Sequence, residues 1–348
     1  MSKKIIIVGA GLSGLTLSYW LSKRNIESII LEASSRIGGR IQTKKGKLDT
    51  PLELGATWFS DVHSNLISLI EELQLDKYPQ FSSGKSLFQT KSFEPAQQFF
   101  VPETDRPSYR LVGGTQKLIE TLAEKISSSS IMLNSKVISI KDEVNKLLVE
   151  TSNGDKISAD KVVLCLPPQV IHSEIQFSPA LPKVLSDVLP NVQTWMAGSI
   201  KFVMEYKRPF WRENGYSGML YSHSGIVVEM YDHTNFEEHK FGFTGFLNDG
   251  FSSFTEEERK EFVIKQLVEL LGDEVLNFIS YKDKIWTDEY TLGKNQIIQR
   301  RHQNNGHPLL QNSYFDHKLY FAGTETSQDF SGYMEGAVLS AIKLSDEF

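Results

Sequence analysis

Residues 4–40 read KIIIVGAGLSGLTLSYWLSKRNIESIILEASSRIGGR, and this stretch decides the fold. It begins with a continuous β-branched run, Ile5–Val8, as expected for a strand buried on both faces of a parallel sheet. The glycine-rich loop Gly9–Gly14 follows at once, and Leu15–Leu21 then has helical spacing. This order predicts a strand, a phosphate-binding loop and a helix, which together begin an α/β dinucleotide-binding domain.

The glycines of this loop have separate physical roles. Gly9 permits the tight turn, Gly11 lets a pyrophosphate approach the backbone, and Gly14 allows the helix to pack closely on the strand. Leu12 and Ser13 belong to the loop, and the N-terminus of the helix that follows would face the phosphates with its unpaired N–H groups. Such a motif alone is weak evidence, because glycine-rich turns after strands are common.

The residues after the second predicted strand narrow the type of dinucleotide. Glu32 stands at the distance where a ribose 2′-hydroxyl would be held. A free hydroxyl suits a carboxylate, whereas a 2′-phosphate would be repelled by it. Gly38, Gly39 and Arg40 follow, so a further backbone segment with a cation can lie against a bulky anionic ligand.

Length and composition set the class of protein. The chain has 348 residues, 40% of them hydrophobic, which allows about two domains with a sizeable core. A formal net charge of −6 without a long basic run argues against nucleic-acid binding. We find no secretory signal or membrane anchor, so we expect a cytoplasmic protein. The single cysteine, Cys165, lies in an apolar run and is interpreted as a core residue.

The pattern predicts an α/β fold with two domains. Residues 1–78, 109–189 and 289–348 are expected to form a Rossmann-like dinucleotide-binding domain. Residues 79–108 and 190–288 are expected to form a substrate domain with a mixed sheet and a helix.

Local signals predict the individual elements. Residues 76–110 hold several prolines and no sustained period, so we expect irregular structure there with short helices. Helices are expected at Asn65–Leu73 (capped by Ser64), Gln116–Ile126, Thr255–Leu271 (Thr255 and Glu258 forming a capping box) and Ser331–Leu344. Later strands are expected at Ile131–Leu133, Lys136–Ile140, Leu147–Thr151, Ala159–Leu166, Trp195–Tyr206, Gly225–Tyr231, Phe241–Leu247 and Lys318–Ala322.

The C-terminal block has the same predicted order of strand, glycine-containing loop and helix as the N-terminal one. Gly323–Thr326 follows a predicted strand, and Gly332–Ala337 opens a predicted helix. With the N-terminal motif, this block resembles the FAD-binding motifs of the flavin-dependent amine oxidase family, which includes monoamine and polyamine oxidases. The resemblance covers most of the chain, through further matches at Leu48–Trp58, Gly113-Gly114, Pro167-Pro168 and Lys207–Trp211.

The resemblance implies FAD as the cofactor and roles for particular residues. Lys201 matches the family lysine that holds a water near flavin N5, and Tyr333 matches an aromatic residue beside the amine. Without the family, we would place Lys201 on an exposed face. The implied cofactor-binding residues are Gly9, Gly11, Leu12, Ser13, Gly14, Glu32, Ala33, Gly38, Gly39, Arg40, Gly55, Ala56, Val137, Gly323, Glu325, Tyr333, Met334 and Ala337.

The chain departs from the family pattern in three respects. No cysteine stands in Thr291–Gln296, where covalent flavoproteins of the family attach the cofactor, so FAD should be bound non-covalently. The segment at residues 76–110 is shorter than the usual helical substrate region, which predicts a more open site. The second ring beside the amine would fall near Lys294 or Asn295, so this cage is half missing or is completed by Trp286, Tyr290 or Trp195.

The resemblance implies oxidation of a small-molecule amine to an imine by hydride transfer to flavin N5, with O2 as the acceptor and hydrogen peroxide as the product. A metal is not required, and His302 and His307 are interpreted as surface residues. Two alternatives keep FAD: renalase-like oxidation of reduced nicotinamide species, and desaturation of a carbon–carbon bond. A non-catalytic FAD-binding protein is a further alternative. The sequence does not indicate an oligomeric state.

Overall fold

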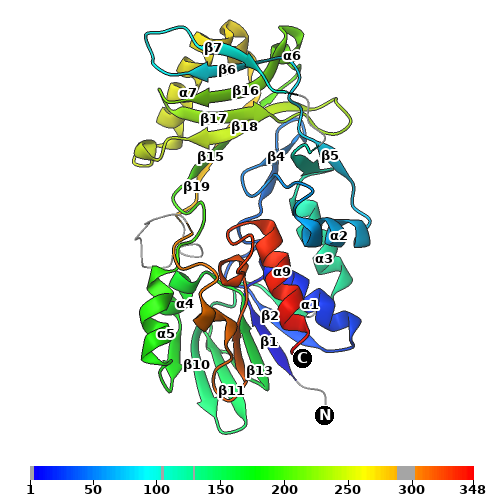
Figure 1. Cartoon of the computed structure of the whole chain (residues 1–348), viewed down its shortest axis with the longest axis vertical. Helices are drawn as coiled ribbons and strands as arrows, with labels where there is room; N and C mark the ends of the chain where they lie inside the picture. Colours follow the sequence, from blue (N-terminus) through cyan, green and yellow to red (C-terminus); the bar gives the residue numbers. More distant parts are fainter. Residues whose placement is uncertain (1–3, 103–105, 128–129, 288–301) are drawn as a thin grey trace.

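The computed structural model describes residues 4–102, 106–127, 130–287 and 302–348. Within them, a five-stranded parallel sheet and a four-stranded sheet lie at one end of an elongated molecule, and a seven-stranded sheet lies at the other (Figure 1). Two small two-stranded sheets, β3-β4 (Thr43–Lys45 and Pro51–Glu53) and β5-β8 (Lys77–Pro79 and Tyr109–Leu111), complete the strands.

The parallel sheet has the strand order β20-β13-β1-β2-β9. Because alternate residues of a strand point to opposite faces, Ile5 and Ile7 pack among the helices on one face, while Ile6 and Val8 pack toward the four-stranded sheet. Both faces are therefore buried, which explains the unbroken apolar run. The strands are β1 (Ile5–Val8), β2 (Ser28–Leu31), β9 (Ile131–Met132), β13 (Lys161–Leu164) and β20 (Leu319–Phe321), and the covering helices are α1 (Leu12–Lys23), α2 (Ser64–Glu72), α3 (Gln116–Lys125) and α9 (Met334–Ser345).

The four-stranded sheet, in the order β12-β11-β10-β14, covers the other face of the parallel sheet. Its main hairpin joins β10 and β11, which pair antiparallel from Val137 opposite Thr151 to Glu143 opposite Lys146. The strands are β10 (Val137–Glu143), β11 (Lys146–Thr151), β12 (Lys156–Ala159) and β14 (Gln176–Ser178). In the chain, α4 (Pro168–Glu174) precedes β14 and α5 (Lys183–Val188) follows it.

The seven-stranded sheet has the order β19-β15-β18-β17-β16-β6-β7. One face packs against α7 through Phe202 and Met204 of β15, which join Val263 and Leu267 of the helix in one core cluster. We call the opposite face, which carries Lys201, the Lys201 face. The bounds are β6 (Lys85–Gln89), β7 (Gln97–Phe100), β15 (Ile200–Tyr206), α6 (Phe210–Glu213), β16 (Tyr216–Ser222), β17 (Val227–Asp232), β18 (Phe241–Leu247), α7 (Glu256–Leu271) and β19 (Ser280–Ile285).

The expectation of irregular structure at residues 76–110 is wrong. Strands β5, β6, β7 and β8 lie there, and β6 pairs in parallel with β16. Their sequence signal is weak, and the pairing of β6 with β16 joins strands that are distant in the chain, so tertiary pairing outweighs local propensity. Strands β16 and β19 were not predicted either, and β15 begins at Ile200 rather than at Trp195.

Two predicted helix caps have different outcomes. The capping box of α7 is confirmed, since the Thr255 side chain accepts from the Glu258 N–H and the Glu258 carboxylate accepts from the Thr255 N–H. The Ser64 cap is wrong, because Ser64 is the first residue of α2. Glu335 of α9 takes its place: its carboxylate accepts from the Asn65 and Leu66 N–H groups at 3.1 and 2.7 Å.

Candidate cofactor and amine site

The glycine loop between β1 and α1 has the geometry of a phosphate site. Gly9 has a φ of 106°, which disfavours any side chain. A Cβ on Gly14 would lie 2.0 Å from the Gly9 carbonyl oxygen, so this position requires glycine. Among the described residues, nothing lies within 4 Å of a Cβ built on Gly11, which leaves that backbone open to a ligand. Helix α1 begins at Leu12 and Ser13 without a side-chain cap, so its first N–H groups suit an anion.

A second uncapped helix begins beside the first. Helix α9 begins at Met334, and Tyr333 before it makes no side-chain cap. The Ser340 hydroxyl links the two helices, since it lies 3.2 Å from the Ser13 hydroxyl and accepts from the Gly323 N–H at 3.1 Å. The N-terminal and C-terminal motifs therefore meet. Two neighbouring helix N-termini around an open glycine loop fit a dinucleotide diphosphate.

Glu32 lies at the end of β2 next to this loop and is buried. Its carboxylate accepts from the Ala10 N–H at 2.7 Å and from the Ser34 N–H and hydroxyl at 3.0 and 2.8 Å. A carboxylate offers about four acceptor sites, so these bonds leave room for a ribose hydroxyl. The cofactor role of Glu32 and of its neighbour Ala33 stays a prediction.

The glycine pair Gly38-Gly39 supports the phosphate loop. The Gly38 N–H donates to the Ala10 carbonyl at 2.8 Å. A Cβ on Gly39 would lie 3.3 Å from the Gly11 Cα. The absence of side chains thus lets this segment lie against the loop itself, and direct contact of the pair with the cofactor stays a prediction.

Arg40 and Glu325, two predicted cofactor residues from opposite ends of the chain, form an ion pair. The Arg40 Nη1 and Nη2 atoms donate to the two carboxylate oxygens of Glu325 at 2.6 and 3.0 Å. The Glu325 side chain is 1% exposed and that of Arg40 is 30% exposed. Such a bidentate pair holds both side chains in one orientation.

Lys201 is buried, with only 2% of its surface exposed, so the exposed-face interpretation is wrong. Its Nζ donates to the Gly55 carbonyl at 2.7 Å and to the Thr57 hydroxyl. Burial lowers the pKa of Lys201 from 10.5 to about 7, and the nearby carboxylate of buried Glu53 opposes this shift.

Gly55 was expected to bind the cofactor, but backbone of the same chain occupies the space where its side chain would lie. A Cβ on Gly55 would lie 2.4 Å from both the Arg40 carbonyl oxygen and the Gln42 nitrogen. The glycine is therefore explained by backbone packing, while its carbonyl orients Lys201. Contact of Gly55 and Ala56 with the cofactor stays a prediction.

Tyr333 lies in a cluster of rings at the start of α9. Its ring centroid is 6.0 Å from that of Trp195, 6.2 Å from that of His302 and 5.8 Å from that of His63. His302 stacks on Trp195 at 4.4 Å with an interplanar angle of 18°. We call Tyr333, Trp195, His302 and His63 the Tyr333 cluster. Burial lowers the pKa of His63, which favours the neutral ring.

The cluster corrects the prediction for His302 and narrows the candidates for the second ring beside the amine. His302 is half-buried rather than a surface residue, and its Nδ1 atom is buried without a hydrogen-bond partner among the described residues. Of the proposed second rings, Trp195 lies beside Tyr333, whereas the Trp286 indole donates to the Leu54 carbonyl at 2.8 Å. Tyr290, Lys294, Asn295 and the segment 291–296 lie outside the described residues.

The remaining predicted residues are placed as follows. Val137 begins β10 with its side chain in the core, so only its backbone is left for an adenine. Ala337 lies in the first turn of α9 and is buried. Cys165 is half-buried against the core, and burial raises its pKa to about 12, which disfavours a nucleophilic thiolate. His307 caps a short 3₁₀ turn through the Leu309 N–H.

The structure combines a parallel sheet, the Gly9–Gly14 loop, an acid at the end of β2 and a second helix N-terminus. This combination is typical of dinucleotide-dependent oxidoreductases. The model of the family described as flavin containing amine oxidoreductase matches residues 12–96 and 86–347. The chain belongs to this family, whose members are FAD-dependent oxidoreductases acting on amines.

Individual relatives agree with this assignment. The probable flavin-containing monoamine oxidase A of Dictyostelium discoideum is 23% identical over 99% of this chain and 96% of its own length. The putrescine oxidase of Kocuria rosea is 22% identical over 84% of each. Among solved structures, a putrescine oxidase bound to putrescine has a TM-score of 0.86 at 20% identity, covering 100% of this chain and 99% of the other. Cyclohexylamine oxidase from Brevibacterium oxydans has a TM-score of 0.86 at 19% identity with the same coverage.

None of the described helices combines the length and the apolar character that crossing a bilayer requires.

Proposed function

We propose that the protein oxidises an amine that binds between the Tyr333 cluster and the Lys201 face, using non-covalently bound FAD and O2. The carrying observation is that Trp195 stands in the chain just before β15, which carries Lys201, while its ring lies 6.0 Å from that of Tyr333. The end of the seven-stranded sheet is thereby held at the start of α9. The start of α9 is also where the helix N-termini fit the cofactor.

Bound FAD would supply two-electron oxidation: it would take a hydride from the α-carbon of the amine, water would hydrolyse the imine to a carbonyl compound and ammonia or a smaller amine, and O2 would take up the electrons as hydrogen peroxide. The protein's part is to position and to desolvate. The ring of Tyr333 would orient the amine, and the buried Nζ of Lys201 would hold a water beside the reacting atoms.

The choice of a neutral amine as the bound form is supported by the electrostatics of the site. Lys201 carries charge in an apolar site at low pH because its pKa lies at about 7. The rings of Tyr333 and Trp195 offer π faces and carry no carboxylate that would pair with an ammonium group. A substrate nitrogen that arrives without its proton avoids repulsion by Lys201.

Anaerobic mixing of the flavin-loaded protein with a panel of amines tests the proposal. We expect bleaching of the flavin by amines and, on admission of air, release of hydrogen peroxide. Dihydronicotinamide is the matched comparison donor, because the renalase-like alternative requires it to bleach the flavin faster than any amine. Bleaching by dihydronicotinamide alone would refute amine oxidation, and a flavin that no donor bleaches would indicate a non-catalytic FAD protein.

A further inference from the structure

One row of residues crosses the Lys201 face from strand to strand. Lys201 of β15 pairs with Phe246 of β18, Phe246 with Glu229 of β17, Glu229 with Tyr221 of β16, and Tyr221 with Phe88 of β6. Residues directly opposite one another project on the same face of a sheet. A carboxylate therefore lies two strands from Lys201, at a backbone spacing of about 10 Å.

Aromatic rings line the interval between the amine and the carboxylate. The Trp58 ring lies 4.8 Å from Lys201 Nζ, 6.4 Å from the Phe246 ring and 4.9 Å from the Tyr231 ring. All three rings are half-buried. Half-buried ring faces beside one another suit the methylene chain of an aliphatic amine and also attract cations.

Hydrogen bonds from tyrosine hydroxyls hold the carboxylate of Glu229 in an orientation that suits a cationic ligand. The Tyr231 hydroxyl donates to Glu229 Oε1, and the Tyr221 hydroxyl lies 2.6 Å from that of Tyr231. Because Tyr231 gives its proton to Glu229, Tyr221 must give its own to Tyr231. Both protons are thus directed toward the carboxylate. Within the described part of the chain, Glu229 Oε2 has no hydrogen-bond partner, and Glu229 itself is half-buried.

We propose that the substrate is an extended amine with a second cationic nitrogen, which Glu229 receives while the first nitrogen lies near Lys201. This inference rests on the proposed function and names its substrate class. A half-buried carboxylate that lacks a cationic partner is costly unless a ligand supplies the charge. The ion pairs in the described residues include none with Glu229, although Lys201 lies close enough to interact with it electrostatically.

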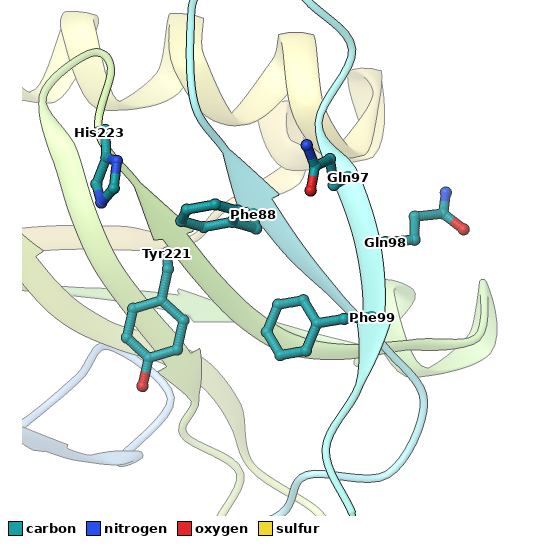
Figure 2. A pocket seen from close by; sticks show the side chains of 6 residues that line it. All are labelled: Phe88, Gln97, Gln98, Phe99, Tyr221 and His223. Atoms are coloured by element: carbon teal, nitrogen blue, oxygen red, sulfur yellow. The ribbon is translucent and has the colours of Figure 1, made fainter.

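Tyr221, the residue that follows Glu229 in this row, lines a hollow. This hollow of 430 Å³ begins at Tyr221 and is walled by the rings of Phe88 and Phe99 (Figure 2). Its other lining residues are polar, namely Gln97, Gln98 and His223, so a chain longer than the Lys201–Glu229 interval has room to continue. The substrate class is accordingly a diamine or a longer polyamine.

Matched amine pairs of equal carbon number test this inference. With putrescine against butylamine and hexamethylenediamine against hexylamine, we expect the wild-type kcat/KM to favour the diamine by about 10- to 100-fold, as one hydrogen bond to a charged group provides. Glu229→Gln should abolish this preference by lowering the diamine values alone. Glu269→Gln, an exposed carboxylate on α7 behind the same sheet, controls for the loss of one negative charge.

Two outcomes would overturn the inference while leaving amine oxidation intact. Equal wild-type kcat/KM within each pair would show that no second charge is recognised. An equal loss for monoamine and diamine in Glu229→Gln would place Glu229 at the reacting nitrogen instead. Bleaching of the flavin by neither member of a pair, nor by any other amine, would contradict the proposed function itself. Flavin content and the visible spectrum of Glu229→Gln show whether the variant is folded.

Discussion

Lys201→Met tests whether a buried, ionisable lysine governs the pH dependence of stability. The lysine lies in an apolar sheet face with Trp58 and Phe246 around its Nζ. Methionine has a similar length and no charge, so it fits the space. The Gly55 carbonyl and the Thr57 hydroxyl lose their donor at every pH, a constant cost of about 1 to 3 kcal/mol. The informative quantity is therefore the slope of stability against pH.

The sign follows from where the proton is bound. The pKa of Lys201 is about 7 in the folded protein and 10.5 in its ordinary environment. Between these values the unfolded chain holds a proton that the folded protein has released, so the free energy of unfolding rises with pH. The slope is about 1.4 kcal/mol per pH unit, or roughly 3 kcal/mol from pH 7 to pH 9. This is an upper limit, because Glu53 titrates in the same site and its pKa is raised by burial.

Urea denaturation of the flavin-loaded wild type and of Lys201→Met, at several pH values from 6 to 9, measures the difference. We expect the stability of the wild type relative to the variant to improve as the pH rises above about 7. Lys282→Met, which removes an exposed lysine of β19, should run parallel to the wild type. A difference between wild type and Lys201→Met that stays flat across this range would refute the burial argument. In kinetics, Lys201→Met should slow turnover or reoxidation, and unchanged rates would remove Lys201 from the mechanism.

Substitutions at three other positions test the cofactor and amine site. Glu32→Ala should weaken FAD retention, because it removes the acceptor beside the glycine loop, and undiminished flavin after dialysis would contradict the ribose role. Glu325→Gln should destabilise the protein by about 2 kcal/mol in urea denaturation, a value reduced by the partial exposure of Arg40, and an unchanged midpoint would show that the pair contributes nothing. Tyr333→Phe should keep kcat/KM within a few-fold and Tyr333→Ala should lower it at least about 10-fold, whereas equal losses would point to the hydroxyl.

The parts of the fold that the sequence predicts are those with short-range signals. Strands β1 and β2 and the helices α1, α3 and α7 follow from continuous apolar runs, helical spacing and caps within a few residues. Strands β6 and β7 were missed because they have neither signal: β6 is held by pairing with β16, which is distant in the chain, and β7 pairs at the sheet edge with β6. The Glu335 cap of α2 was missed for the same reason, since it joins positions far apart in the chain.

The residues of the candidate site also differ in whether local sequence signals reveal them. The glycine loop and Glu32 are local, so the sequence locates them. His302 is not, because only the folded chain brings its ring against Trp195 and Tyr333. Glu229 is similar: it stands in β17 with alternating neighbours, and nothing in its local sequence indicates that Phe246 separates it from Lys201. The sheet register is the information that single-sequence patterns lack.

The segment 40–57 explains why the cofactor site and the amine site belong to one unit. At one end, Arg40 is fixed by its ion pair with Glu325 beside α9. At the other end, the Gly55 carbonyl accepts from Lys201 of the seven-stranded sheet. The two ends are packed on each other, because only glycine at position 55 leaves room for the Arg40 carbonyl. We therefore expect any shift of the Arg40 backbone on cofactor binding to move the acceptor of Lys201, since closely packed backbones transmit displacement. The segment that carries Arg40 thus also fixes the position of Lys201. The proposed role of Lys201 beside the flavin requires this position to be accurate.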